Sequence, residues 1–454
     1  MIRRHWQQEL MARSRRAVCW LQPGLLVKRW VFTSGLGLLT ALLGGAIWAD
    51  LKPIYWILET LSWLLGKLTT ALSRRVTGPL VVLIGVALIL LGQSRSFGSI
   101  KQALVPEKNT VLIDALRAKN RLNRGPSIVA IGGGTGLSTL LSGLKRYSSR
   151  ITAIVTVTDD GGSSGILRRE LGILPPGDIR NCLAALSTEE PLLTRLFQYR
   201  FSSGNGLEGH SFGNLFLSAL TAITGNLETA IIASSRILAV QGQVVPATDI
   251  DVKLWAELEN GQYIEGESTI GHAPSPIVRI GCLPAHPPAL PRALKAIANA
   301  DLILLGPGSL YTSLLPNLLV PELVSAIQRS CAPRLYICNL MTQPGETDGL
   351  DVRGHLRAIE AQLTSLGSSQ RLFHAVLAQD ELPNSTIVES GQSRGAEPVL
   401  CDANGLRQDG YDVTQVSLQR ADPTSGLQHD PHSLALAIMR FYRKHKKESS
   451  QVPP

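Results

Sequence analysis

Aromatic residues are scarce in this sequence: Trp, Tyr and Phe together make up 5% of 454 residues. Proteins that bind single-stranded nucleic acid stack bases on aromatic side chains set among basic ones. The C-terminal part of the chain has no such platform of alternating basic and aromatic residues. The composition therefore argues against nucleic acid as a partner.

Cysteine is equally sparse, and its spacing excludes the common cysteine-based sites. No two cysteines form a C-x-x-C pair, and no histidine cluster has the spacing of a zinc site. We expect reduced, mostly buried thiols in a cytosolic domain, without structural disulfides. The six cysteines are Cys19, Cys182, Cys282, Cys331, Cys338 and Cys401.

Three signatures of familiar enzyme classes are missing. No Ser-His-Asp order occurs, which argues against a serine hydrolase. The stretch GGGTGLS at 132–138 has Leu137 where a dinucleotide fingerprint needs glycine, and no Lys-Ser/Thr pair ends it as in a Walker A loop. A nicotinamide-dinucleotide binder is therefore disfavoured.

Long uncharged runs are present, but only near the N-terminus. Residues 31–49 carry no charge and would span roughly 28 Å as a helix, close to the thickness of a bilayer core. Residues 76–92 are also uncharged, at the short limit for a span. We expect both to cross the membrane within an anchor at 1–93, with 50–75 forming an interfacial helix or an external hairpin.

Positive charge flanks these two runs, within a net charge of +9. Because basic residues favour the cytoplasmic side, both termini and the main domain are expected in the cytoplasm, at the inner (plasma) membrane. A cleaved signal peptide is the alternative. The basic lead of about 30 residues is too long for one, and no small-residue cleavage site precedes the globular part.

The rest of the chain has the pattern of an α/β protein. After a linker at 94–125, apolar runs alternate with helical patterns to about residue 440, and 441–454 is expected to be disordered. This predicts a Rossmann-like, mostly parallel sheet with helices on both faces. An antiparallel insertion around Asn260-Gly261, at 251–280, is expected to cover an edge. The expected strands are 127–132, 151–158, 236–242, 301–306, 334–340 and 372–379.

A glycine-rich turn joins the first of these strands to a helix. Glycine lets a ligand approach the backbone closely, and a helix N-terminus attracts anions. The turn is therefore a candidate anion site, with a tight turn that binds nothing as the alternative. Its residues are Gly132, Gly133, Gly134, Thr135 and Gly136.

Two acids follow the second strand. Asp159 and Asp160 lie where an α/β nucleotide binder keeps an acid for ribose hydroxyls, and they are equally suited to hold Mg²⁺. A solvated loop with an Asx turn would also explain them. The loop continues with further donors at Gly161, Gly162, Ser163 and Ser164.

Other polar residues lie at later joints. Asp178 suits a helix cap, whereas Arg180 and Asn181 in the same first turn point to a phosphate instead. His210, four residues before Asn214, is a candidate general acid or substrate contact. With Asp159 and Asp160, His210 completes the candidates for catalysis.

The loops after the strands at 301–306 and 334–340 are also rich in donors. Because carboxyl ends of parallel strands meet at one edge, these loops together suit a polyphosphate that carries a sugar. Their candidate residues are Gly306, Gly308, Ser309, Tyr311, Thr312, Ser313, Asn339 and Thr342.

Six motifs in this order resemble the YvcK-like gluconeogenesis-factor family. They are GGGTGLS, TVTDDGGSSG, PPGDIRNCL, EGHSFGNL, GPGSLYTSLLPNLL and MTQPGETDG, within residues 126–440. That family is related to 2-phospho-L-lactate transferase, the CofD enzyme of deazaflavin coenzyme synthesis. The N-terminal 93 residues lie outside the resemblance.

The resemblance implies a domain that binds a nucleotide-diphosphate sugar such as UDP-N-acetylglucosamine and regulates cell shape and wall synthesis during gluconeogenic growth. The glycine turn and the GPGSLYTS loop would hold the diphosphate, and Arg180, Asn181, His210 and Asn214 would line the sugar or acceptor side. No cofactor is required on this reading. The alternative is a transferase-like enzyme that uses Mg²⁺, and self-association into homo-oligomers is left open.

Overall fold

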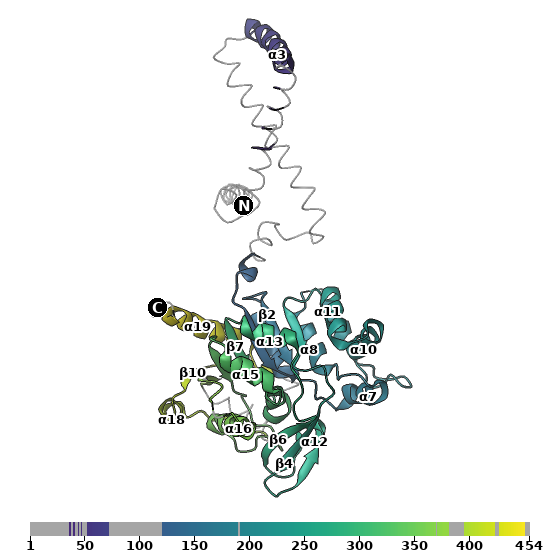
Figure 1. The fold of residues 1–454 in the computed structure, drawn as a ribbon, viewed down its shortest axis with the longest axis vertical. Helices are drawn as coiled ribbons and strands as arrows, with labels where there is room; N and C mark the ends of the chain where they lie inside the picture. Colours follow the sequence, from purple (N-terminus) through teal and green to yellow (C-terminus); the bar gives the residue numbers. More distant parts are fainter. Residues whose placement is uncertain are drawn as a thin grey trace, which may run out of the picture. The chain divides into compact units, whose positions relative to one another are not determined.

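The structure is a computed structural model that divides into two compact units, Met1–Leu112 and Ile113–Pro454 (Figure 1). It describes residues 52–71, 120–188, 191–368, 370–380, 395–422 and 426–449, with five single residues between 36 and 47. Each unit is treated by itself below.

The first unit contains helix α3, Lys52–Ala71, within the segment expected to be an interfacial helix or a hairpin. Its side chains Tyr55, Trp56 and Trp63 are exposed. The expected span at 76–92, and all but the single described residues of 31–49, lie outside the described residues, so the anchor stays a prediction. Among the described residues, no single helix has the length and apolarity to cross a bilayer, and one sharply bent pair, Leu310–Leu318 with Pro321–Arg329, meets both criteria.

The second unit is built on a parallel sheet of seven strands, which confirms the expected α/β class. The order across the sheet is β10-β9-β8-β7-β1-β2-β3. The strands are β1 Ile128–Gly132, β2 Ile151–Val155, β3 Gln243–Pro246, β7 Leu302–Leu305, β8 Arg334–Ile337, β9 Ala375–Gln379 and β10 Asp412–Val416.

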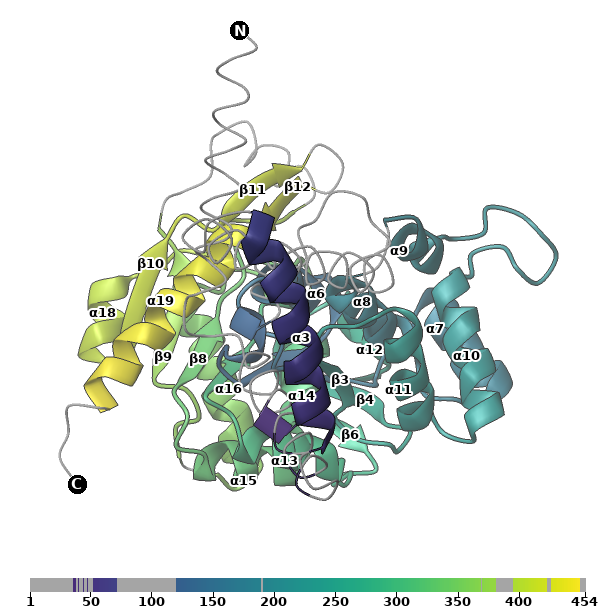
Figure 2. The same ribbon diagram turned by 90° about the horizontal axis from the view of Figure 1, so that it is seen from above.

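The sheet is buried on both faces, and each face has its own hydrophobic core. Alternate side chains of β1 divide between the cores: Val129 and Ile131 belong to one, Ile128 and Ala130 to the other. The first core contains α13 Pro291–Ala298, α14 Leu315–Leu318, α15 Pro321–Arg329 and α16 Val352–Ser365 (Figure 2). The second contains α6 Gly134–Leu144, α8 Gly177–Leu186 and α19 Pro431–Ser449. This double burial explains the nearly continuous apolar runs of the strands.

The chain changes direction across the sheet once, between β1 and β7. It passes from β1 through β2 to the edge strand β3, returns to β7 beside β1, and continues through β8 and β9 to the other edge at β10. The loops that follow β1 and β7 therefore leave neighbouring strands toward opposite edges. Such a switch point opens a crevice at the carboxyl ends of the strands.

Between β3 and β7 lies the expected antiparallel insertion. It is a three-stranded sheet of β4 Lys253–Leu258, β5 Tyr263–Glu265 and β6 Ile277–Leu283, and the short helix α12 Glu267–Ile270 lies between β5 and β6 in the chain. Gly261, with φ +80°, turns the hairpin between β4 and β5, as the Asn-Gly signal predicts. The insertion packs mainly against α12, α14 and α16, so the expectation that it covers a sheet edge is wrong.

The other elements surround the sheet or its carboxyl ends. These elements are α7 Gly162–Leu171, α9 Pro191–Gln198, α10 Phe212–Thr224, α11 Leu227–Ile237, the π-helical turn η1 Leu310–Leu314, α18 Ala403–Gln408, β11 Gln419–Asp422 and β12 Gly426–His429. The last two strands form a two-stranded hairpin, which packs on α6.

Two further expectations are wrong. The run 236–242 is not a strand, because α11 extends to Ile237 from its cap at Asn226, and β3 begins only after Gly242, whose φ is +116°. Its apolar residues pack as the end of a helix and a turn. The tail is not disordered from residue 441, since α19 continues to Ser449 and buries Phe441 and Tyr442 in the second core.

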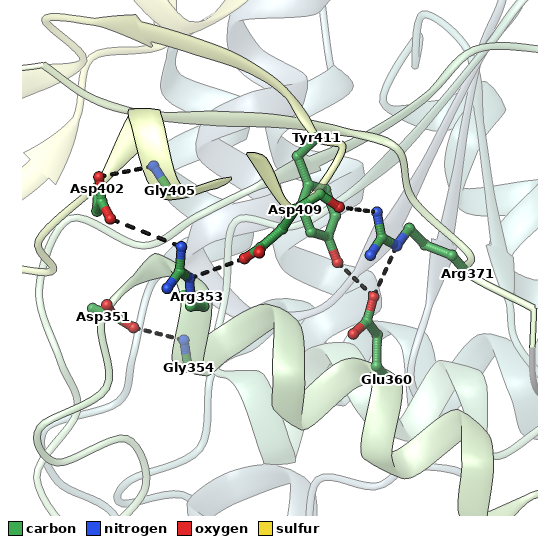
Figure 3. A network of polar contacts seen from close by, with 9 residues as sticks. All are labelled: Asp351, Arg353, Gly354, Glu360, Arg371, Asp402, Gly405, Asp409 and Tyr411. Carbon is green, nitrogen blue, oxygen red and sulfur yellow. Dashed lines mark hydrogen bonds and ion pairs between the residues drawn. The ribbon is translucent and has the colours of Figure 1, made fainter. Parts of the chain in front are cut away.

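Polar contacts fasten α16 to α18 and to the chain before β10 (Figure 3). Arg353 lies between Asp402, at 3.8 Å, and Asp409, at 3.1 Å. Glu360 accepts hydrogen bonds from Arg371 Nε at 3.0 Å and from the Tyr411 hydroxyl at 2.5 Å. This network holds the β10 edge of the sheet, away from the switch point.

We expect Ile154→Ala to lower the free energy of unfolding by about 2–5 kcal/mol, because Ile154 of β2 is fully buried in the first core. The matched change Val278→Ala on β6, where the side chain is 54% exposed, should cost less than about 1 kcal/mol. Urea unfolding followed by circular dichroism measures both. Equal losses in the two variants would contradict the placement of β2 in the core.

Candidate functional site

A cavity of about 250 Å³ opens at the carboxyl ends of β1, β7 and β8, at the switch point of the sheet. Loops from these three strands and the β11–β12 hairpin form its walls. The lining residues are Gly133, Gly134, Thr135, Gly136, Thr139, Pro307, Gly308, Ser309, Ser313, Asn339, Leu340, Met341, Thr342, Gln343, Leu427, Gln428 and His429.

The first wall is the glycine-rich turn and the beginning of α6. Gly134 has φ +65°, a left-handed conformation that only glycine adopts readily. A Cβ on Gly136 would lie 2.5 Å from the carbonyl oxygen of Pro307, so glycine also lets the β7 loop approach. The N-cap, Gly133, offers no side chain to the first turn of α6. The amides of this turn, together with the helix dipole, make this wall suited to an anion.

The second wall is the loop after β7, which residues after β8 hold in place. Asn339 accepts a hydrogen bond from Gly308 N at 3.0 Å and donates one to Gly308 O at 2.8 Å. Gln343 Nε2 donates to Ser309 Oγ at 2.8 Å. Thr342 Oγ1 accepts from Glu397 N instead, so its hydroxyl supports the wall through the backbone.

The third wall, the β11–β12 hairpin, had no counterpart among the sequence candidates. It contributes Leu427, Gln428 and His429. Burial lowers the pKa of His429 to about 4, so its imidazole is neutral at physiological pH.

A second polar cluster lies at the end of β2, around the N-terminus of α7. Ser163 Oγ is 3.0 Å from His210 Nδ1, and Asn214 Nδ2 donates to Ser163 Oγ at 3.0 Å and to Ser164 Oγ at 3.4 Å. All four side chains are buried. The structure thus brings the sequence candidates of two separate motifs into one hydrogen-bonded group.

Asp178 contacts the glycine-rich wall of the cavity. Its carboxylate accepts a hydrogen bond from the Gly134 amide. The helix cap expected of Asp178 is wrong, because the N-cap of α8 is Pro176 and no side chain caps it. Loss of solvation, with a smaller contribution from Asp159, raises the pKa of Asp178 from 3.8 to about 6.

Other carboxylates crowd the same region. Burial, and then the charges of Asp159, Asp178, Asp160 and Glu346, raise the pKa of Glu267 from 4.5 to about 9. Glu267 Oε2 is buried without a hydrogen-bond partner. Burial also raises the pKa of Glu346, which accepts hydrogen bonds from the amides of Tyr311 and Thr312 at 2.9 Å.

The two acids after β2 contact backbone amides. Asp159 Oδ1 accepts from Gly161 N at 2.9 Å, the Asx turn considered as an alternative, and Asp160 Oδ1 accepts from Ser268 N at 2.9 Å. In the described part of the chain, no three His, Cys, Asp or Glu side chains gather as metal ligands. A Mg²⁺ ion at Asp159 and Asp160 stays a prediction, because one or two carboxylates together with ligand phosphates are enough to hold this ion.

Several sequence candidates lie outside the lining of the cavity. Gly132 and Gly306 lie at or directly after the strand ends, and Tyr311 donates its hydroxyl to Ile277 O at 3.3 Å. Arg180 donates to Asn181 at 2.8 Å and lies beside Gly213, near the second cluster. These residues support the loops around the cavity.

Three residues with clear roles in this region escaped the sequence analysis. Gln343 is the glutamine of the MTQPGETDG motif, but its contact with Ser309 depends on the β7 loop folding over it. Glu267 and His429 come from short elements, α12 and β12, whose approach to the site follows from tertiary packing. The motif was the available signal for Gln343, whereas Glu267 and His429 had only their polarity, which does not distinguish them from surface residues.

Fold and cavity together define an α/β protein with a cavity at the switch point of a parallel sheet. The family described as 2-phospho-L-lactate transferase CofD matches residues 128–419. The chain belongs to this CofD family, within which the resemblance to gluconeogenesis factors is confirmed.

Its relatives include proteins of similar length. A protein of Nostoc sp. is 55% identical over 93% of this chain and 92% of its own. The gluconeogenesis factor of Bacillus subtilis is 46% identical over 71% of this chain and its whole length. A crystal structure of a UPF0052 family member from Bacillus halodurans has a TM-score of 0.66 at 44% identity, covering 70% of this chain and 99% of that one.

We expect Glu267→Gln to stabilise the protein above neutral pH. Because the pKa of Glu267 is raised from 4.5 to about 9 on folding, the folded state binds more protons between these values, and stability falls as pH rises through this window. The variant should therefore gain about 1–3 kcal/mol at pH 8 and little at pH 4.

Urea unfolding at pH 4, 6 and 8 measures this effect. Glu265→Gln on the exposed strand β5 is the matched control and should leave the pH dependence unchanged. A Glu267→Gln variant with wild-type pH dependence would show that this carboxylate is not in the crowded, desolvated setting described here.

Proposed function

We propose that this protein binds a nucleotide-diphosphate sugar, similar to UDP-N-acetylglucosamine, in the cavity between β1 and β7. The observation that carries this proposal is the glycine-rich helix N-terminus at the switch point, facing a second loop of small and hydroxyl-bearing residues. Diphosphates are bound in α/β proteins at this position by backbone amides and the helix dipole.

The chemistry of the walls supports a ligand with both phosphate and sugar parts. Among the described residues that line the cavity, none is Lys, Arg, Asp or Glu. Neutral donors hold the phosphates on this proposal, without the ion pairs that an enzyme uses to stabilise transferred charge. Hydroxyl and amide groups on the remaining walls suit a sugar.

We infer that binding regulates cell shape and wall synthesis during gluconeogenic growth, with little or no turnover. The name of the Bacillus subtilis relative, gluconeogenesis factor, supports the metabolic setting. A regulator needs only a difference in affinity between two conformations, and the loops of the switch point are the elements that a bound diphosphate would fix.

A transferase is the second candidate, because the matched family is described as 2-phospho-L-lactate transferase CofD. The buried Ser163–His210 pair is the observation that favours it. A histidine beside a hydroxyl can remove its proton, and Asn214 orients that hydroxyl.

The protein is also proposed to sit at the inner membrane, with its main domain in the cytoplasm. The uncharged runs 31–49 and 76–92 and their basic flanks support this. We expect the full-length protein to stay with the membrane pellet after alkaline carbonate extraction. Release into the supernatant would contradict the two spans.

We expect Gly134→Ala to weaken binding of UDP-N-acetylglucosamine at least about tenfold in isothermal titration. The added methyl group forces a residue with φ +65° out of position and displaces amides that would contact phosphate. Gly172→Ala is the matched control, since Gly172 has φ +64°, has open space around it, and lies at the far end of α7.

Both variants should lose about 1 kcal/mol of stability, and only Gly134→Ala should lose affinity. Absence of binding of any nucleotide sugar to the wild-type protein would reject the proposed function. Formation of a new phosphodiester from a nucleotide conjugate, abolished by Ser163→Ala, would favour the transferase instead.

A further inference from the structure

Two residues that line the cavity each carry one buried side-chain atom that has no hydrogen-bond partner. These atoms are Nε2 of His429, on β12, and Oε1 of Gln343, in the loop after β8. His429 is only 8% exposed. A buried polar atom without a partner is costly, and such atoms in a cavity point to a group that the ligand supplies.

The bond made by the other nitrogen of His429 fixes the chemistry of the free one. The imidazole makes a hydrogen bond with the backbone of Cys338 that favours its protonated form, so the ring donates to the Cys338 carbonyl. Since Nε2 has no partner, the donor is Nδ1. A neutral ring with its proton on Nδ1 has a bare lone pair on Nε2. The unpaired nitrogen of His429 is therefore an acceptor.

Gln343 presents the same kind of atom. Its amide nitrogen donates to Ser309 Oγ at 2.8 Å, which leaves the carboxamide oxygen as the group without a partner. An oxygen and a bare imidazole nitrogen both repel phosphate oxygens and both attract hydroxyl protons. The lining residues thus offer two kinds of polar group: backbone amides in the glycine turn, and acceptor side chains at Gln343 and His429.

We propose that His429 Nε2 and Gln343 Oε1 accept hydrogen bonds from hydroxyl groups of the ligand's sugar. This rests on the proposed function and adds the direction of binding: phosphates lie at the beginning of α6, and a sugar lies toward the β11–β12 hairpin. His429 and Gln343 then determine specificity, because a ligand without these hydroxyls would leave both acceptors unpaired.

The test compares three ligands by isothermal titration of the full-length protein: UDP-N-acetylglucosamine, UDP and 2′,3′-dideoxy-UDP. His429→Leu should lower the affinity for the ligand that carries the contacting hydroxyl roughly tenfold. It should leave the affinity for the ligand without that hydroxyl at the wild-type value. His429→Gln places an amide near the position of Nε2 and should restore most of the affinity.

The pattern of losses identifies which sugar is bound there. If the ribose contacts His429, the preference for UDP over its dideoxy analogue disappears in His429→Leu. If the second sugar does, the preference for UDP-N-acetylglucosamine over UDP disappears instead. Either result supports the proposal.

His355→Leu is the matched control. His355 is also fully buried, with Nε2 unpartnered and Nδ1 bonded to Asp351 O, but it is not part of the cavity lining. This variant should keep the wild-type affinity for all three ligands. Melting curves establish whether each variant folds. If His429→Leu does not fold, Gln343→Met removes the other acceptor in its place.

The proposal requires that the wild-type protein binds the nucleotide sugar. Given that binding, the proposal would be overturned if His429→Leu lowered the affinity for all three ligands equally, or for none of them. Failure of the wild-type protein to bind any of them would reject the proposed function, and this inference with it.

Discussion

The close approach of two backbones at the switch point is the constraint on which the rest of the structure depends. The loops after β1 and β7 leave toward opposite edges of the sheet, yet Gly136 and Pro307 come so close that no side chain fits between them. Glycine at 134 and 136 permits this geometry, and Asn339 locks the β7 loop through both polar groups of Gly308. The cavity is therefore formed by the fold itself, with few side chains needed to shape it.

Around this cavity, charge is arranged in an unusual way. The lining is neutral, while carboxylates with raised pKa values gather beside it, and Asp178 joins the two regions through the Gly134 amide. An anion at the beginning of α6 would have to coexist with this acidic neighbour. On the proposed function, the acidic region and a bound diphosphate would influence each other's stability through one shared helix N-terminus.

Several elements were predictable from local pattern alone. Strands such as Leu302–Leu305 are continuous apolar runs buried on both faces, and the Asn260-Gly261 turn has the chemistry of a tight hairpin. The prediction of a strand at 236–242 is wrong because these apolar residues form the end of a helix capped at Asn226. A short apolar segment by itself does not show whether it folds as a helix or as a strand. The prediction of a disordered tail is wrong because Phe441 and Tyr442, which lie among many charged residues, are buried by α19 against the second core.

The sequence by itself determined the α/β class, the glycine-rich turns and their common location at strand ends, because these depend on local apolar runs and on the backbone freedom of glycine. Tertiary structure alone decided that β7 lies beside β1, that Asp178 contacts Gly134, and that Ser163, His210 and Asn214 form one group. It also decided that the β11–β12 hairpin closes the cavity with His429. These contacts join segments far apart in the chain, and no local pattern encodes which distant partner a polar side chain will meet.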